Sequence, residues 1–105
     1  MEEMNVQELA DRIKAGNAPQ IIDVREPNEF AYARIPGAVL KPLGDFREWA
    51  QELDKDREYV LQCHTGSRSL YVTRYLQTQG FARARSVRGG IDAWAREVDP
   101  TVRRY

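Results

Sequence analysis

The hydrophobic pattern of residues 59–80 changes its period halfway, and this change strongly constrains the fold. Residues 59–62, Tyr-Val-Leu-Gln, are apolar and rich in β-branched and aromatic side chains after a charged turn, so they predict a buried strand. From Leu70 onward, apolar residues recur at three- and four-residue spacing up to Gly80. This spacing is typical of a helix that ends at a C′ glycine. The chain therefore passes from strand to helix at residues 63–69.

The same alternation runs through the rest of the chain. An apolar stripe after Asn5, ending before Gly16, predicts a first helix, with Asn5 and Glu8 resembling a capping box. Further short apolar runs predict strands at residues 20–24, 38–40 and 86–87. Further periodic patterns predict a short helical turn that begins at residue 26, and helices at residues 45–53 and 91–98. Strands that alternate with helices imply an α/β fold, with a parallel sheet covered on both faces.

Length and composition predict one globular domain over residues 1–105. The chain has 42% hydrophobic and 30% charged residues, which is ordinary for a folded domain. Its net charge is zero, which argues against a general nucleic-acid or membrane binder. Residues 1–56 carry 12 acidic and 7 basic side chains and residues 57–105 carry 4 and 9, so small anions are expected near the second half. Residues 99–105 follow the last helical pattern and are expected to form a loose tail.

The cysteine count and the N-terminus indicate the compartment. One cysteine excludes an internal disulfide and a cysteine-rich metal site, and one histidine beside it does not complete a metal site. A reducing compartment follows as the default. The N-terminus is acidic without an apolar signal region, and no run approaches membrane-spanning length. The sequence therefore predicts a cytoplasmic protein without a bound metal.

Cys63 stands at the strand-to-helix turn, where a thiol can become reactive. Backbone N–H groups at a helix N-terminus are unpaired and carry positive partial charge, so they favour a thiolate and bind anions. Gly66 allows a tight turn with its N–H groups facing inward, and Arg68 can close the loop or hold an anion. The alternative is a lone cysteine packed as a small hydrophobe. Such a cysteine needs neither the glycine nor the arginine, so the pattern favours catalysis.

Four motifs, in this order, resemble those of the rhodanese-like sulfurtransferases in their single-domain form. They are Asp-Val-Arg…Glu-Phe at 23–30, Ile-Pro-Gly-Ala at 35–38, Cys-x-x-Gly-x-Arg-Ser at 63–69 and Gly-Gly-x-x-Ala-Trp at 89–94, within about residues 5–98. The resemblance implies a five-stranded parallel sheet between helices. It also implies a cysteine that carries sulfur as a persulfide, and no cofactor.

The resemblance also implies roles for individual residues. Cys63 would be the nucleophile, and the loop after it would bind the substrate through its N–H groups; that loop comprises His64, Thr65, Gly66, Ser67, Arg68 and Ser69. Asp23, Arg25 and Glu29 would give structural support, with Asp23 bracing the loop and Glu29 pairing with Arg25. His64 would face solvent or contact the donor rather than act as a base.

The implied reaction moves a sulfane sulfur from a small anionic donor, such as thiosulfate, to an outside acceptor. No second cysteine in the chain can resolve the persulfide, so the acceptor would be cyanide in an assay, or a small thiol or partner protein in the cell.

Two other classes of protein share features of this pattern. Cysteine-dependent phosphatases and arsenate reductases also set a thiolate in an anion-binding loop closed by arginine. Their loops place five residues between Cys and Arg, whereas here there are four, His64 through Ser67, so the ring of N–H groups suits one sulfur atom better than a phosphate. Non-catalytic regulatory modules of the same fold typically lack the cysteine, which is present here.

Overall fold

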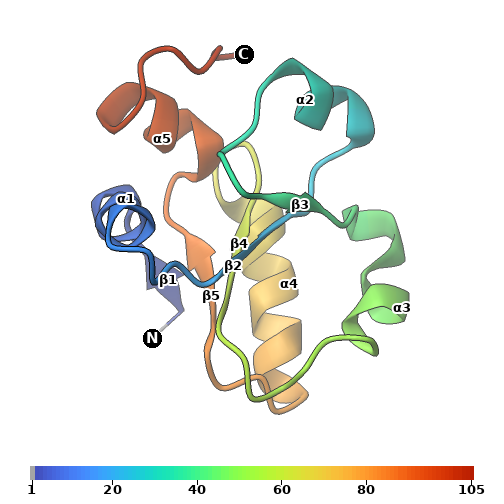
Figure 1. Cartoon of the computed structure of the whole chain (residues 1–105). Helices are drawn as coiled ribbons and strands as arrows, with labels where there is room; N and C mark the ends of the chain where they lie inside the picture. The colour runs from blue at the N-terminus through green and yellow to red at the C-terminus, as the bar shows by residue number, and fades with distance from the viewer. Residues whose placement is uncertain (1) are drawn as a thin grey trace.

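Five strands form one parallel sheet at the centre of the molecule (Figure 1). In the computed structural model, which describes residues 2–105, the strand order is β1-β5-β4-β2-β3, and every neighbouring pair is parallel. The strands are β1 (Glu3–Met4), β2 (Gln20–Asp23), β3 (Val39–Leu40), β4 (Tyr59–Gln62) and β5 (Ala84–Val87). The expected five-stranded α/β fold is confirmed.

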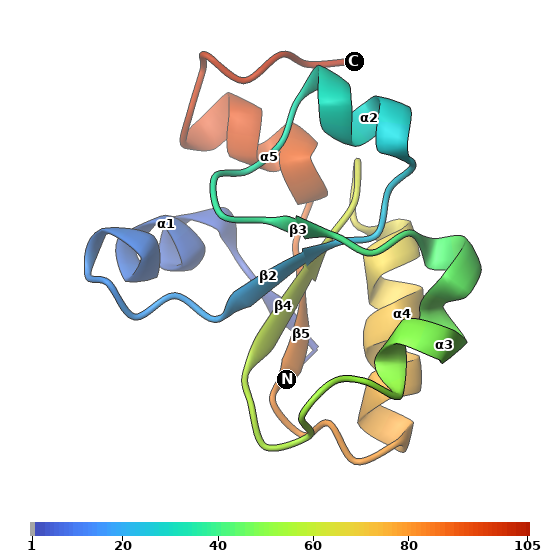
Figure 2. The same cartoon turned by 45° about the vertical axis from the view of Figure 1, so that its right-hand side comes forward.

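Helices cover both faces of this sheet. They are α1 (Val6–Lys14), α2 (Pro27–Tyr32), α3 (Phe46–Ala50), α4 (Ser67–Thr78) and α5 (Gly90–Glu97), with a short 3-10 helix, η1, at Leu43–Asp45. One hydrophobic cluster joins the sheet to α3 and α4, and a second joins it to α1 and α5. Figure 2 shows α2 beyond the end of the sheet at which β2 and β4 finish. Within residues 2–105, no helix is both long and apolar enough to cross a bilayer.

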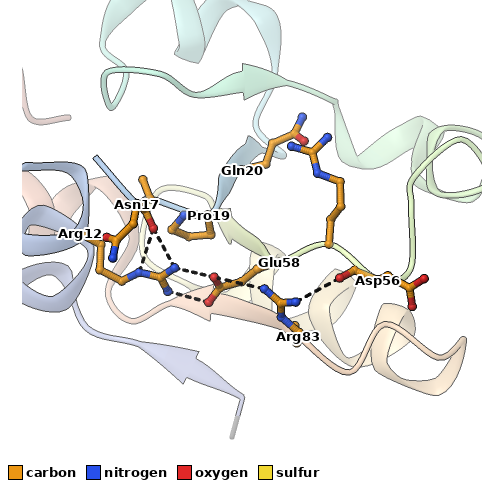
Figure 3. A pocket seen from close by; sticks show the side chains of 9 residues that line it. Arg12, Asn17, Pro19, Gln20, Asp56, Glu58 and Arg83 are labelled. Carbon is orange, nitrogen blue, oxygen red and sulfur yellow. Dashed lines mark hydrogen bonds and ion pairs between the residues drawn. The ribbon is translucent and has the colours of Figure 1, made fainter. Parts of the chain in front are cut away.

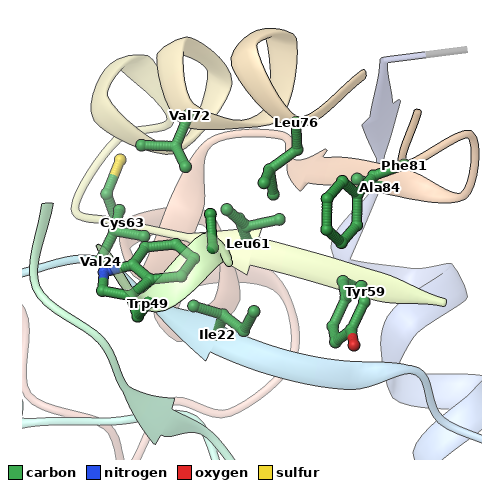
Figure 4. Packing of buried hydrophobic residues seen from close by; sticks show 11 residues of the cluster. Ile22, Val24, Trp49, Tyr59, Leu61, Cys63, Val72, Leu76, Phe81 and Ala84 are labelled. Carbon is green, nitrogen blue, oxygen red and sulfur yellow. The ribbon is translucent and has the colours of Figure 1, made fainter. Parts of the chain in front are cut away.

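Strand β4 lies at the centre of the sheet and is buried on both faces. All four of its residues are buried, and it pairs with β2 on one side and β5 on the other. Successive side chains of a strand point to opposite faces, so Val60 joins the cluster under α1 and α5 while Leu61 joins the cluster under α4. Figure 4 shows Val72 and Leu76 of α4 directed toward Leu61. This packing fixes the position of Cys63, which directly follows β4.

Asn5 caps α1 as the sequence predicts, but the capping box is only half formed. Its side-chain oxygen accepts a hydrogen bond from the N–H of Glu8 at 2.8 Å, which satisfies one of the free donors of the first turn. The carboxylate of Glu8 binds Arg85 of β5 at 3.1 Å instead of returning to the cap. The first helix is thereby tied to the sheet.

Three elements differ from the sequence-based prediction. Strand β1 was not predicted, because two residues at a sheet edge carry no detectable period; Met4 is nevertheless buried and pairs with Val87. Strand β5 begins at Ala84, two residues before the predicted start. The helix predicted over 45–53 is shorter, since η1 precedes it and α3 ends at Ala50.

An ion cluster ties α1 to the sheet at the end opposite Cys63. The guanidinium of Arg12 donates to both carboxylate oxygens of Glu58, with Nη1 2.6 Å from Oε2, and Arg83 and Arg85 lie 3.8 and 3.6 Å from the same carboxylate. Hydrogen bonding from Arg12 lowers the pKa of Glu58. Arg12, Glu58 and Arg83 line a shallow cavity of about 420 Å³, which Figure 3 shows. Since Glu58 neutralises part of the positive charge, we interpret this cluster as structural.

The tail after α5 folds back onto the domain, which differs from the expected loose tail. Val102 packs against the cluster under α5, and Arg104 forms an ion pair with Asp92 at 3.1 Å. The ring of Tyr105 lies edge-on against Tyr32, with centroids 5.9 Å apart. In Figure 2 the tail passes over α5 and ends close to α2. Apolar and aromatic side chains in this short segment explain why it packs.

Candidate active site

Cys63 lies between the end of β4 and the start of α4, at the carboxyl edge of the parallel sheet. Ligands of open α/β sheets bind at this edge. The four residues from Cys63 to Gly66 connect the two elements, and α4 begins at Ser67. We call residues 63–69 the cysteine loop. Its position is the one that the sequence predicts from the change of hydrophobic period.

The cysteine loop directs hydrogen-bond donors at the sulfur atom. The thiol is buried, with a relative exposure of 0%. Its Sγ accepts hydrogen bonds from the backbone N–H of Gly66 at 3.1 Å and of Ser69 at 3.4 Å. The hydroxyl Oγ of Ser69 lies 3.4 Å from Sγ and 2.7 Å from Oγ of Ser86 on β5. The hydroxyl of Ser69 also donates to the carbonyl oxygen of Gly66 at 3.2 Å. The two backbone N–H groups can stabilise negative charge on sulfur.

Exposure divides the predicted binding residues into two groups. Gly66 and Ser69 are buried beside the sulfur, whereas Thr65 and Ser67 are exposed. His64 is half-buried, and its ring stacks on that of Tyr105, with centroids 4.0 Å apart and planes 9° from parallel. The cysteine loop therefore has a buried side that holds the thiol and an exposed side that carries Thr65 and Ser67.

The N-terminus of α5 forms hydrogen bonds to the backbone of the cysteine loop. The N–H groups of Ile91 and Asp92 donate to the carbonyl oxygens of Cys63 and His64 at 2.9 and 3.0 Å. This approach is close because Gly90 has no side chain; a Cβ there would lie 2.3 Å from the carbonyl oxygen of Cys63. Gly90 also has a φ of +58°, which disfavours other residues. The Gly-Gly pair of the last motif thus allows the helix to reach the loop.

Arg68 forms a two-pronged ion pair with Glu29. Its Nη1 and Nη2 atoms donate to Oε1 and Oε2 of Glu29 at 2.8 and 2.9 Å. The predicted pairing of Glu29 with Arg25 is wrong: Arg25 precedes α2 and points into the core, while the side chain of Glu29 faces α4. Hydrogen bonding from Arg68 lowers the pKa of Glu29 to about 2, and Glu29 raises the pKa of Arg68. The pair joins α2 to the cysteine loop.

Asp23 and Arg25 form a second ion pair, which is entirely buried. Both side chains have 0% exposure, and Nη2 of Arg25 lies 2.7 Å from Oδ2 of Asp23. The carboxylate also accepts the backbone N–H of Arg25 at 3.0 Å. Because a buried charge needs a partner, the two residues hold each other. Asp23 thus holds Arg25, whose Nη1 donates to Tyr105 at 2.9 Å; the bracing of the loop by Asp23 stays a prediction.

The sequence-based prediction of the site misses three residues that contact the cysteine loop. Ser86 belongs to a strand predicted as core, and nothing in its neighbourhood in the sequence signals a hydroxyl beside Ser69. Tyr105 lies in the tail. Gly90 is part of the Gly-Gly-x-x-Ala-Trp motif, but its φ and its contact with Cys63 depend on how α5 packs.

Replacing Glu29 with glutamine should destabilise the domain at neutral pH and remove part of its acid sensitivity. The folded pKa of about 2 lies below the ordinary 4.5, so the carboxylate stabilises the fold fully above about pH 4.5 and loses this effect as the pH falls toward 2. We expect Glu29→Gln to cost about 2 kcal/mol at neutral pH, after allowance for partial exposure, and almost nothing near pH 2. Urea unfolding of both proteins across this pH range measures the effect. A cost that does not change with pH would contradict its ionic origin.

Comparison with known proteins places this chain in a family. Residues 5–97 match the family described as Rhodanese-like domain. The chain is 42% identical over 100 residues to "Putative sulfurtransferase YtwF" of Bacillus subtilis, covering 95% of this chain and 96% of the relative. It is 36% identical over 100 residues to a protein of Allochromatium vinosum named sulfurtransferase, covering 95% and 94%.

Solved structures agree with this match. A rhodanese-like domain protein from Staphylococcus aureus superposes with a TM-score of 0.84 at 30% identity, over 100% of this chain and 99% of the other. A rhodanese-related protein from Thermoplasma volcanium superposes with a TM-score of 0.83 at 31% identity, over 93% and 94%. The chain, with its cysteine loop between β4 and α4, therefore belongs to the rhodanese-like domain family.

Proposed function

We propose that this protein is a sulfurtransferase that carries a sulfane sulfur on Cys63. The observation that carries the proposal is the arrangement around Sγ, where two backbone N–H groups and a serine hydroxyl face the sulfur within 3.4 Å. These groups suit a thiolate, which is the reactive form of a cysteine. The names of two relatives, "Putative sulfurtransferase YtwF" and "Sulfurtransferase", support the same reaction.

The proposed reaction has two displacement steps. In the first, the thiolate of Cys63 attacks the outer sulfur of an anionic donor such as thiosulfate. A new S–S bond forms to Cys63, the S–S bond of the donor breaks, and sulfite leaves with the electron pair. In the second, cyanide or an acceptor thiolate attacks the outer sulfur of the persulfide, and the electron pair returns to the sulfur of Cys63.

The cysteine loop would stabilise both charged states of the enzyme. The N–H groups of Gly66 and Ser69 already point at Sγ, so little reorganisation accompanies the formation of negative charge there. Arg68 adds a positive charge beside the loop, and its ion pair with Glu29 holds the guanidinium in place. The acceptor comes from outside, because Cys63 is the only cysteine of the chain.

The size of the cysteine loop favours sulfur transfer over the phosphatase alternative. Four residues separate Cys63 from Arg68, and the N–H groups of Gly66 and Ser69 converge on the sulfur itself at 3.1 and 3.4 Å. A phosphate would need donors arranged around a wider space beyond the sulfur. A non-catalytic regulatory role is disfavoured because the nucleophile is present.

Intact-protein mass spectrometry after incubation with thiosulfate tests the proposal. We expect the mass to rise by one sulfur atom, with the gain mapped to Cys63, and to return to its original value when cyanide is added. Sulfite and thiocyanate should appear in equal amounts with each turnover. No mass gain at saturating thiosulfate, or hydrolysis of an aryl phosphate instead, would overturn the assignment to sulfur transfer.

A further inference from the structure

Four side chains form a connected cluster over the exposed side of the cysteine loop. They are Glu29, His64, Arg68 and Tyr105, and we call them the mouth cluster. Glu29 binds Arg68, the hydroxyl of Tyr105 donates to Oε2 of Glu29 at 2.8 Å, and the ring of Tyr105 stacks on His64. The cluster thus connects α2, the cysteine loop and the tail through side-chain contacts alone.

The sulfur atom of Cys63, which the mouth cluster adjoins through His64 and Arg68, is closed off from solvent. Cys63 has 0% exposure, while His64 and Arg68, which follow it in the loop, are partly exposed. A sulfur donor must reach Sγ directly, since a displacement reaction needs the two sulfur atoms in line. Some part of the surroundings of Cys63 therefore moves before the reaction. The part that moves most easily is the one held by the fewest backbone hydrogen bonds.

We propose that Tyr105 is a positioning residue that holds the site closed, and that its departure gives donors and acceptors access to Cys63. This inference rests on the proposed function for its biological meaning. Tyr105 lies in a tail without regular secondary structure and is 44% exposed, whereas Glu29 and Arg68 are fixed on helices. Chain segments held by few backbone hydrogen bonds open at the lowest free-energy cost.

The hydroxyl of Tyr105 couples this movement to the two ion pairs. It accepts a hydrogen bond from Nη1 of Arg25 at 2.9 Å and donates one to Glu29 at 2.8 Å. Burial raises the pKa of Tyr105, so the hydroxyl remains protonated and able to donate. When the ring leaves, His64 loses its stacking partner and Glu29 loses one of its donors. The two-pronged ion pair between Arg68 and Glu29 does not involve Tyr105 and stays in place.

The tail that brings Tyr105 back to the site follows the region that matches the family model, which ends at residue 97. Two further contacts keep the tail on its path: Arg104 pairs with Asp92, and the guanidinium carbon of Arg103 lies 5.5 Å from the ring centroid of Tyr32. Tyr105 is thereby held in place through side chains that a small displacement can release.

The rate of thiol alkylation tests the inference without any sulfur donor. Cys63 is the only cysteine, so the reaction with iodoacetamide, or with a bulky pyrene maleimide, reports on this thiol alone. We expect Tyr105→Ala to raise the rate with iodoacetamide about tenfold and the rate with the bulky reagent by more. Tyr105→Phe keeps the stack on His64 but loses both hydrogen bonds, so its rates should fall between those of the wild type and Tyr105→Ala.

Tyr71→Ala is the matched control. Tyr71 is a 59% exposed tyrosine of α4 that packs against Phe46 rather than the mouth cluster, so its replacement should change neither rate. Urea unfolding of each variant separates local opening from lost stability, because alkylation through global unfolding raises the rates with both reagents equally. Unchanged rates in Tyr105→Ala, or equal increases that follow its loss of stability, would overturn the inference. Because no sulfur donor is needed, this result is independent of the persulfide experiment.

Discussion

Gly90→Ala is expected to lower both the stability of the domain and the reactivity of Cys63. A Cβ at this position would lie 2.3 Å from the carbonyl oxygen of Cys63 and 2.6 Å from that of His64, and backbone atoms cannot yield as a flexible side chain can. The φ of +58° adds a cost of about 1–2 kcal/mol for any residue with a Cβ. We therefore expect a loss of about 3 kcal/mol or more.

The effect on activity should be equally large. To relieve the contact, the N-terminus of α5 must withdraw, and the hydrogen bonds from Ile91 and Asp92 to the loop carbonyls then lengthen. A displacement of about 1 Å in a catalytic group can cost about 100-fold in rate. Steady-state sulfur transfer and urea unfolding measure the two effects.

Gly16→Ala provides the control for this experiment. Gly16 also has a positive φ, +77°, but no atom lies within 4 Å of the position of its Cβ. It follows α1, far from the cysteine loop. This variant should show only the conformational cost of about 1 kcal/mol and no change in activity. Equal losses in the two variants would mean that backbone conformation, and not the approach of α5 to the loop, explains the effect of Gly90→Ala.

Cys63→Ser is expected to abolish sulfur transfer while leaving the fold intact. The hydroxyl is close in size to the thiol and would meet the same donors, the N–H groups of Gly66 and Ser69, so we expect stability to change by less than about 1 kcal/mol. An alcohol at neutral pH is a far poorer nucleophile than a thiolate. The rate should fall by about three orders of magnitude or more. Thiocyanate formation measures it, and substantial residual transfer would contradict a cysteine persulfide.

Much of the site can be predicted from sequence because its centre depends on local pattern. The buried strand β4, the turn at Cys63 and the helix α4 are adjacent in the chain, so a change in hydrophobic period is enough to locate the nucleophile. The N–H groups that face the sulfur follow from the same geometry, since a helix N-terminus presents free N–H groups wherever it occurs. Gly66 is recognisable because a tight turn at this point requires it.

The partners of the charged residues could not be predicted in the same way. Arg25 and Glu29 are four residues apart and look like a pair on one helix, but α2 begins at Pro27 and leaves Arg25 outside it. Arg25 instead folds back on Asp23, and Glu29 meets Arg68 from a position 39 residues distant. Which cation reaches which carboxylate depends on how α2 packs over the sheet, and no periodicity in the chain encodes that.

The support of the cysteine loop by α5 has a consequence for the order in which the protein matures during translation. The carbonyl groups of Cys63 and His64 find their donors at Ile91 and Asp92, and β1, at the start of the chain, pairs with β5 near its end. A nascent chain that has emerged only as far as α4 already contains the thiol and the glycine turn. It lacks the helix that holds their backbone. The surroundings of the reactive sulfur are thus completed only after α5, which follows α4 in the chain, has left the ribosome.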